Sequence, residues 1–239
     1  EAVIKSEGKA KYALGSVLGH VLLHQTINGN EAILQMEQAG DYPDIIVGCT
    51  GGGSNLAGLM FPFLGQQLRG GQKIDIIGCE PLSCPSFTKG KYAYDHGDMA
   101  RMTPLIKMHT LGSDFLPPAN HSGGLRYHGM SYHLSHLYDL GLMRAKAYGQ
   151  KDCFEAGVMF GKQEGIIPAP EGNHAVKGAI DAALDCKKKG ESKTILFNLC
   201  GHGHFDMTAY DDYFSGRLAD DFYDENSANQ SLASLPEIA

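Results

Sequence analysis

The sequence has no tryptophan, no long hydrophobic run and no Cys-x-x-Cys pair. Without an apolar segment of about 20 residues, no transmembrane helix is predicted. The first residues also lack the apolar core and cleavage site of a signal peptide. Six cysteines are scattered along the chain, and this spacing favours reduced, buried thiols over disulfides or a zinc knuckle. These absences predict a cytoplasmic protein.

Positive charge is also scarce, with 20 Lys and Arg against 27 Asp and Glu and a formal net charge of −7. Nucleic acids and anionic membranes bind to basic faces, so neither is a predicted partner. The chain does have 43% hydrophobic residues and 31 glycines in 239 residues, which is typical of an α/β protein. This length allows one large domain or two small ones.

Hydrophobic periodicity predicts alternating helices and strands. Residues 9–25 and 28–38 predict two successive helices, the second ending at Gly40. Strands are then predicted at residues 45–47, 74–78, 143–148 and 194–199, and helices at residues 55–68, 131–140, 151–164 and 173–189. This order predicts a mostly parallel sheet with helices on both faces.

Two segments do not follow this alternation. Residues 81–127 are rich in Gly, Pro, His and aromatic residues and are too long for an ordinary connection, which predicts a binding or interface loop. The acidic, weakly periodic residues 215–239 predict a loosely docked or exposed tail. Residues 44–214 between the leading helices and this tail form the predicted α/β domain.

Three consecutive glycines follow the first predicted strand, in the segment DIIVGCTGGGSNLAG from Asp44 to Gly58. Glycines allow a tight turn and a close approach to a ligand, and the following helix start aims unpaired N–H groups at one point. The segment therefore predicts an anion cradle, although the spacing matches neither a nucleotide P-loop nor a dinucleotide fingerprint. A glycine-rich turn with no ligand is the alternative.

A second turn with reactive side chains follows the last predicted strand, where Cys200 precedes His202 and His204 in NLCGHGHFD. Ligands of parallel sheets bind at the carboxyl ends of strands, so Cys200 and the glycine turn face one crevice if the first and last strands are neighbours. Metal binding by Cys200, His202 and His204, completed by Asp206 or a distant residue, is the alternative interpretation.

The third segment with candidate functional residues is EGIIPAPEGNHA, in which Glu171 stands where a helix is predicted to begin. A carboxylate at this position is favoured by the helix dipole, which gives a purely structural interpretation. The functional alternative is a pocket carboxylate beside a cationic or proton-exchanging cofactor.

Four motifs in this order, GCTGGGSN, HSGGLRYHGM, EGIIPAPE and NLCGHGHFD, resemble the carboxyl-terminal half of the tryptophan synthase β-subunit. Arg before Tyr in GGLRYHG, the GHGH sequence and the leading KYALGSVLGHVLLHQTINGNEA resemble its second-type branch. The resemblance implies a pyridoxal-phosphate enzyme of fold type II that joins L-serine, or O-phosphoserine, to indole. It also implies a homodimer.

The resemblance assigns roles to individual residues. The cofactor phosphate would be bound by the glycine turn and the start of the next helix, namely Gly51, Gly52, Gly53, Ser54 and Asn55. Glu171 would lie near the cofactor ring and assist proton movements. Cys200 replaces the usual Ser facing the pyridine nitrogen, and Arg126 replaces an Asp that handles the serine hydroxyl. A cation at Arg126 would favour a donor with an anionic leaving group.

The lysine that forms a Schiff base with the cofactor belongs to the family's amino-terminal half, and no segment of this sequence matches it. Residues 1–43 are therefore predicted to form the junction with a missing amino-terminal domain, supplied in cis or in trans. The chain alone is predicted to be inactive. Alternatives are a related β-elimination activity, such as serine deamination, and a non-catalytic binding module.

Overall fold

A four-stranded parallel sheet forms the centre of the computed structural model, which describes residues 2–220 and 222–237. The strand order is β5-β2-β1-β6, with β1 at Ile45–Cys49, β2 at Asp75–Pro81, β5 at Arg144–Tyr148 and β6 at Ile195–Phe197. Because neighbouring strands are parallel, their carboxyl ends meet at one edge.

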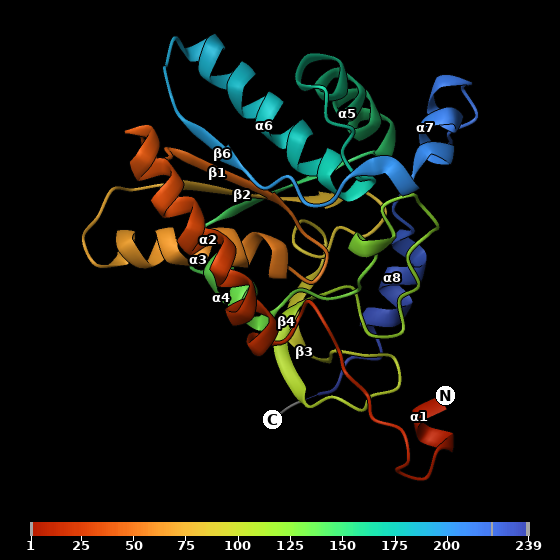
Figure 1. The fold of residues 1–239 in the computed structure, drawn as a ribbon. Coiled ribbons are helices and arrows are strands. Elements are labelled where there is room, and N and C mark those ends of the chain that lie inside the picture. The colour runs from red at the N-terminus through yellow and green to blue at the C-terminus, as the bar shows by residue number, and fades with distance from the viewer. Residues whose placement is uncertain (1, 221, 238–239) are drawn as a thin grey trace.

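Helices cover both faces of this sheet (Figure 1). One layer contains α2 (Gly19–Ala39), α3 (Ser54–Leu68) and α4 (Tyr132–Asp139), and the opposite layer contains α5 (Gln150–Glu164) and α6 (Pro170–Lys189). The short helices are α1 (Ala2–Lys5), α7 (Met207–Phe214) and α8 (Glu225–Leu232). The predicted fold class is confirmed. Among the described residues, none of the helices combines the length and hydropathy that a bilayer crossing requires.

The core lies on both sides of the central strand β1, which is buried along its whole length. Successive side chains of a strand point to opposite faces. Ile46 therefore packs with the α2–α3 layer, whereas Ile45 and Val47 pack against the α6 layer. This double burial explains why the strand appears in the sequence as a continuous apolar run.

One long helix, α2, replaces the two helices predicted for residues 9–25 and 28–38. The prediction was wrong at the start of the first helix, because residues 9–18 are not helical, and wrong about a break after residue 25, because α2 continues through Gly29. Gly29 packs directly on the backbone of α3, where an added Cβ would lie 2.6 Å from the Gly58 carbonyl oxygen. Gly29 therefore permits a close helix crossing. The junction role predicted for residues 1–43 remains a prediction.

The segment predicted as a long loop contains an antiparallel hairpin of β3 (Lys91–His96) and β4 (Leu105–Thr110). The tail is also more ordered than predicted. Helix α8 buries Ala228 in a small cluster with Leu111 and Phe115, so residues 225–232 are docked. Helix α8 was not predicted because its buried residues, Ala228 and Ser231, are small and give little hydrophobic periodicity.

Glu80 on β2 fixes the start of the region that leads to the hairpin. Its fully buried carboxylate accepts hydrogen bonds from the Phe87 and Thr88 backbone N–H groups, at 2.8 and 2.9 Å. It also accepts one from the Thr88 hydroxyl at 2.6 Å. Burial raises the pKa of Glu80 from 4.5 to about 7, because a desolvated carboxylate is disfavoured.

We expect this shift to make the free energy of unfolding fall as pH rises from about 5 to 8. The folded state holds the Glu80 proton up to about pH 7, whereas the unfolded chain releases it near pH 4.5, so the folded state binds more protons in that window. The maximum effect is about 3 kcal/mol. Urea denaturation at several pH values measures it. Glu80→Gln should flatten this part of the profile, and an unchanged slope would contradict the assignment.

Candidate functional site

The glycine turn connects β1 to α3 at the carboxyl edge of the sheet. Five consecutive backbone N–H groups, those of Gly51, Gly52, Gly53, Ser54 and Asn55, have no hydrogen-bond acceptor within the part of the chain that the structure describes. The three glycines are buried. Buried N–H groups without acceptors are destabilising, so this turn has the donors that a multiply charged anion requires.

Neighbouring segments fix the shape of the turn. Gly53 adopts φ 99°, a left-handed conformation that favours glycine, and an added Cβ there would lie 2.9 Å from the Met130 sulfur. The Gly52 carbonyl accepts a hydrogen bond from the Ser131 N–H at 3.0 Å. At Gly51, a Cβ would lie 2.8 Å from the Cα of Leu125. The turn is therefore held tightly against residues 125–131.

Cys200 lies beside this turn, as predicted for neighbouring strands, since β6 pairs directly with β1. Its Sγ is 3.3 Å from the Sγ of Cys49, the last residue of β1. The hydrogen bond between the two thiols lowers the pKa of Cys200 and, together with burial, raises the pKa of Cys49. Cys200 is half-buried, whereas Cys49 is buried.

Two asparagines complete this arrangement. The Asn55 side chain donates a hydrogen bond from Nδ2 to the Cys49 Sγ at 3.0 Å. Its Oδ1 accepts from the Nδ2 of Asn198, which follows β6. These contacts hold the side-chain amide of Asn55 between β1 and β6. The backbone N–H of Asn55 is therefore the group that this residue has left for an anion at the turn.

Glu171 lies in the first turn of α6, where the sequence places the start of a helix. Its Oε1 accepts a hydrogen bond at 2.8 Å from the N–H of Gly124, in the 3-10 helix η1 (Gly123–Leu125). No partner for Oε2 lies among the described residues. The negative charge of Glu171 acts on Cys200 and opposes the lowering of the Cys200 pKa. Glu171 and Cys200 therefore belong to one cluster with the glycine turn.

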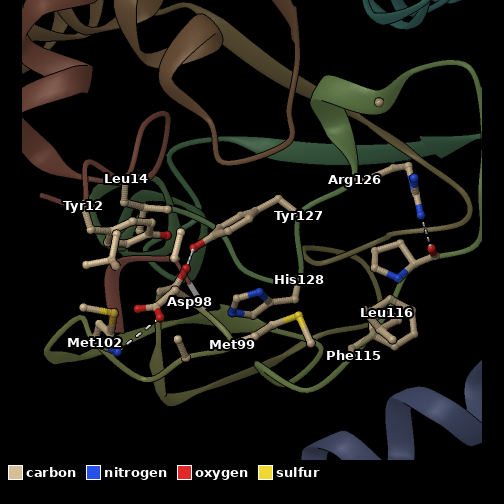
Figure 2. A pocket seen from close by; sticks show the side chains of 16 residues that line it. Tyr12, Leu14, Asp98, Met99, Met102, Phe115, Leu116, Arg126, Tyr127 and His128 are labelled. Carbon is tan, nitrogen blue, oxygen red and sulfur yellow. Dashed lines mark hydrogen bonds between the residues drawn. The ribbon is translucent and has the colours of Figure 1, made fainter. Parts of the chain in front are cut away.

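Arg126 lies outside that cluster, in a neighbouring cleft of about 670 Å³. Figure 2 shows its side chain extending toward Phe115 and Leu116, away from Asp98 and Met102 on the other wall. Its guanidinium donates a hydrogen bond to the Pro117 carbonyl at 2.6 Å. The backbone of Arg126 directly follows η1, and residues 51–55 of the glycine turn are not among the residues that line this cleft.

The two histidines that follow Cys200 lie at an exposed edge. His202 forms an isolated antiparallel β-bridge with Pro168, and its Nδ1 accepts a hydrogen bond from the His204 N–H at 3.3 Å. Within residues 2–220 and 222–237, no group of three His, Cys, Asp or Glu side chains is arranged to hold a metal ion. The metal alternative for Cys200, His202 and His204 has no geometric support in that part of the chain.

Sequence reasoning missed Cys49 and Asn198 as members of the site. Both stand at the carboxyl ends of strands, Cys49 at the end of β1 and Asn198 directly after β6. That position was visible in the sequence, but the adjacency of β1 and β6 was not. Pairing of the two strands is what brings Asn198 to Asn55 and Cys49 to Cys200.

The cluster matches the requirements of a phosphate-bearing cofactor. A dianion fits a row of free amides at a helix start. A carboxylate and a thiol next to that row supply groups that hold or donate protons. The four-stranded parallel sheet with helices on both faces is the fold of the fold type II pyridoxal-phosphate enzymes.

Solved structures share this fold. A fungal L-serine ammonia-lyase from Rhizomucor miehei superposes with a TM-score of 0.62 at 14% identity, covering 90% of this chain and 64% of that one. A threonine deaminase from T.th. gives a TM-score of 0.54 at 15% identity, covering 79% and 53%. Residues 20–201 match the family described as "Pyridoxal-phosphate dependent enzyme", and the chain belongs to that family.

The sequence is similar to tryptophan synthase beta chains. It is 58% identical to the tryptophan synthase beta chain 2 of Methanosarcina mazei over 87% of this chain and 47% of the relative. It is 57% identical to that of Aquifex aeolicus over 90% and 50%. The chain thus spans about half the length of the curated relatives it matches. The resemblance to the second-type branch is confirmed, and pyridoxal phosphate is the cofactor of the family.

Proposed function

We propose that this chain supplies the cofactor-binding part of a tryptophan synthase β-type enzyme that joins L-serine, or O-phosphoserine, to indole. The row of five free amides next to Cys200 and Glu171 carries the proposal, together with 58% identity to a tryptophan synthase beta chain 2. The lysine-bearing part of the site comes from an amino-terminal segment in cis or in trans. Without that segment, the chain is inactive.

The amides of Gly51–Asn55 bind the cofactor phosphate in this proposal. Ser54 adds its hydroxyl, and no basic side chain is required because several N–H dipoles converge on the anion. The Asn55 side chain contributes indirectly, since its contacts with Cys49 and Asn198 fix the first turn of α3.

Cys200 and Glu171 act at the cofactor ring. When bound, pyridoxal phosphate supplies an electron sink for bonds at the amino-acid Cα and Cβ. A neutral Cys200 thiol would be the hydrogen-bond donor for the pyridine nitrogen and would leave that nitrogen uncharged, a state suited to β-elimination and β-replacement. Glu171 holds or releases a proton at Oε2 while its Oε1 stays anchored to Gly124.

Arg126 bears on the choice of amino donor. Its guanidinium lies in the cleft beside η1, held by the Pro117 carbonyl. Because the guanidinium faces this cleft and not the glycine turn, it would have to rotate away from Pro117 before it could offer a bidentate cation to an anionic leaving group such as phosphate. O-phosphoserine is therefore the donor that this residue favours over serine.

Binding of pyridoxal phosphate to the isolated chain tests the site directly. We expect saturable binding in equilibrium dialysis, displaced by inorganic phosphate, because the phosphate cradle lies entirely on this chain. Glu171→Gln should leave this phosphate-dominated binding within about threefold, since a single interaction to the ring is worth about 0.6 kcal/mol or less at an exposed edge. If pyridoxal phosphate did not bind, or if inorganic phosphate did not displace it, the assignment of the glycine turn as the phosphate site would be refuted.

Turnover tests the larger proposal. The chain is mixed with the part of the Methanosarcina mazei relative that it does not match, together with pyridoxal phosphate, indole and either donor. Tryptophan formation only in the mixture is the expected result. Pyruvate without tryptophan would instead favour the β-elimination alternative, and no product with either donor would contradict the enzymatic assignment. Sedimentation of the mixture also tests the homodimer that the family resemblance implies.

A further inference from the structure

Cys49 and Cys200 form a pair of thiols that the fold places in direct contact. Their Sγ atoms are 3.3 Å apart, and the residues come from β1 and from the segment directly after β6. Since β1 and β6 pair with Val47 opposite Phe197, extending that register places Cys49 opposite Leu199, one residue before Cys200. Adjacent strands lie about 4.8 Å apart, a separation that disulfide geometry accommodates.

We propose that Cys49 and Cys200 are a thiol modification site that forms a reversible disulfide when the chain meets a small-molecule disulfide. The sulfurs must approach by about 1.2 Å to reach a covalent S–S length of about 2.05 Å. β6 is a three-residue edge strand, and Cys200 lies beyond its last residue. The following residue, Gly201, has a φ of 75°. Cys200 can therefore shift with little loss of sheet hydrogen bonds.

The two thiols differ in exposure and in pKa, so that one can react first with an external disulfide and the other can then react with the product. Cys200 is half-buried and reaches an external reagent, whereas Cys49 is only 2% exposed. The thiolate is the attacking form, and the lower pKa of Cys200 favours that form. The remaining cysteines in the structure, Cys79, Cys84, Cys153 and Cys186, are all buried.

The exchange balances in two steps. The Cys200 thiolate attacks one sulfur of the reagent, breaks its S–S bond and releases the first small thiol. The Cys49 sulfur then attacks Cys200 in the mixed disulfide, loses its proton and releases the second small thiol. Two protein thiols are oxidised, and one small disulfide is reduced to two thiols.

The linkage would affect the cofactor, a consequence that rests on the proposed function. A disulfide has no S–H to offer a pyridine nitrogen. It would also alter the Cys49 sulfur that accepts the Asn55 hydrogen bond. The oxidised chain would therefore hold the cofactor ring less well than the reduced chain.

Disulfide mapping of the native chain tests the inference. The reduced protein is treated with 2-hydroxyethyl disulfide, its remaining thiols are alkylated, and its peptides are analysed by mass spectrometry. We expect two of the six thiols to be lost, a linked peptide pair containing Cys49 and Cys200, and full reversal by dithiothreitol. A lasting mixed disulfide at Cys200, with Cys49 alkylated as a free thiol, would overturn the proposal, as would an unmodified Cys200.

Three variants sharpen the result. Cys49→Ser should stop the reaction at the mixed disulfide on Cys200, and Cys200→Ser should leave Cys49 reduced. Cys79→Ala is the matched control, because Cys79 is the other strand partner of Cys49 and its loss should leave the linkage unchanged. A Cys49–Cys79 linkage in the native chain would overturn the assignment.

Failure of this inference is distinguishable from failure of the proposed function. A reduced chain that forms the linkage but binds no pyridoxal phosphate supports the thiol site and contradicts the cradle. A chain that binds pyridoxal phosphate but forms no Cys49–Cys200 linkage supports the phosphate site and contradicts the thiol site.

Discussion

Gly58→Ala is expected to lower the free energy of unfolding by about 3 kcal/mol or more, the largest stability effect among the substitutions considered. An added Cβ at Gly58 would lie 2.6 Å from the carbonyl oxygen of Gln25, which is backbone and cannot rotate away. Gly29 faces α3 at the same crossing. Helices α2 and α3 would have to separate, which would loosen the cluster containing Leu22 and Ala32.

Gly65→Ala provides the matched control for that helix. Gly65 also lies in α3, but its nearest neighbour is the flexible end of Arg69, 3.3 Å from an added Cβ. Because alanine is the better helix former, this change should be neutral or stabilise by up to about 1 kcal/mol. Urea denaturation compares the two variants. Equal effects at Gly58 and Gly65 would mean that the helix crossing does not depend on a missing side chain.

Gly53→Ala is expected to reduce pyridoxal phosphate binding by at least about tenfold, or about 1.4 kcal/mol. Its φ of 99° disfavours any side chain, and the added Cβ would press on the Met130 sulfur at 2.9 Å. The turn must then rotate, and the amides from Gly51 to Asn55 no longer converge on one phosphate. Equilibrium dialysis measures the loss.

Gly40→Ala separates this local effect from general strain. Gly40 also has a left-handed conformation, with φ 69°, but no atom lies within 4 Å of an added Cβ there. The change should lower stability by about 1 kcal/mol and leave binding unaffected. If Gly53→Ala bound pyridoxal phosphate as well as Gly40→Ala, the glycine turn would not be the phosphate site.

The central strands β1 and β2 were predictable because they are buried on both faces. Continuous apolar runs such as IIVGC at Ile45–Cys49 exceed what a solvent-facing strand would contain, and glycine marks the turn that follows. The leading helix was not predictable in the same way. Gly29 resembles a helix break in sequence, and only contact with α3 shows that it is a packing position.

The parts of the candidate site can be recognised in the sequence, although their roles remain predictions. The glycine turn, Glu171 and Cys200 each follow a pattern with its own physical reason, and the structure brings them into one cluster. The contacts of Asn198 and Cys49 depend on strand adjacency, which local periodicity does not encode. The placement of Arg126 also depends on tertiary structure, because residue spacing does not say which side of η1 its long side chain takes.

The sequence by itself determined the secondary-structure alternation and the chemistry at each strand end, because periodicity and glycine conformational freedom are local properties. Tertiary structure alone decided that β6 lies beside β1 and that α2 crosses α3 at Gly29 and Gly58. It thereby decided which thiol meets Cys200. Those outcomes depend on packing between segments up to 151 residues apart, and a chain must fold before such segments can select one another.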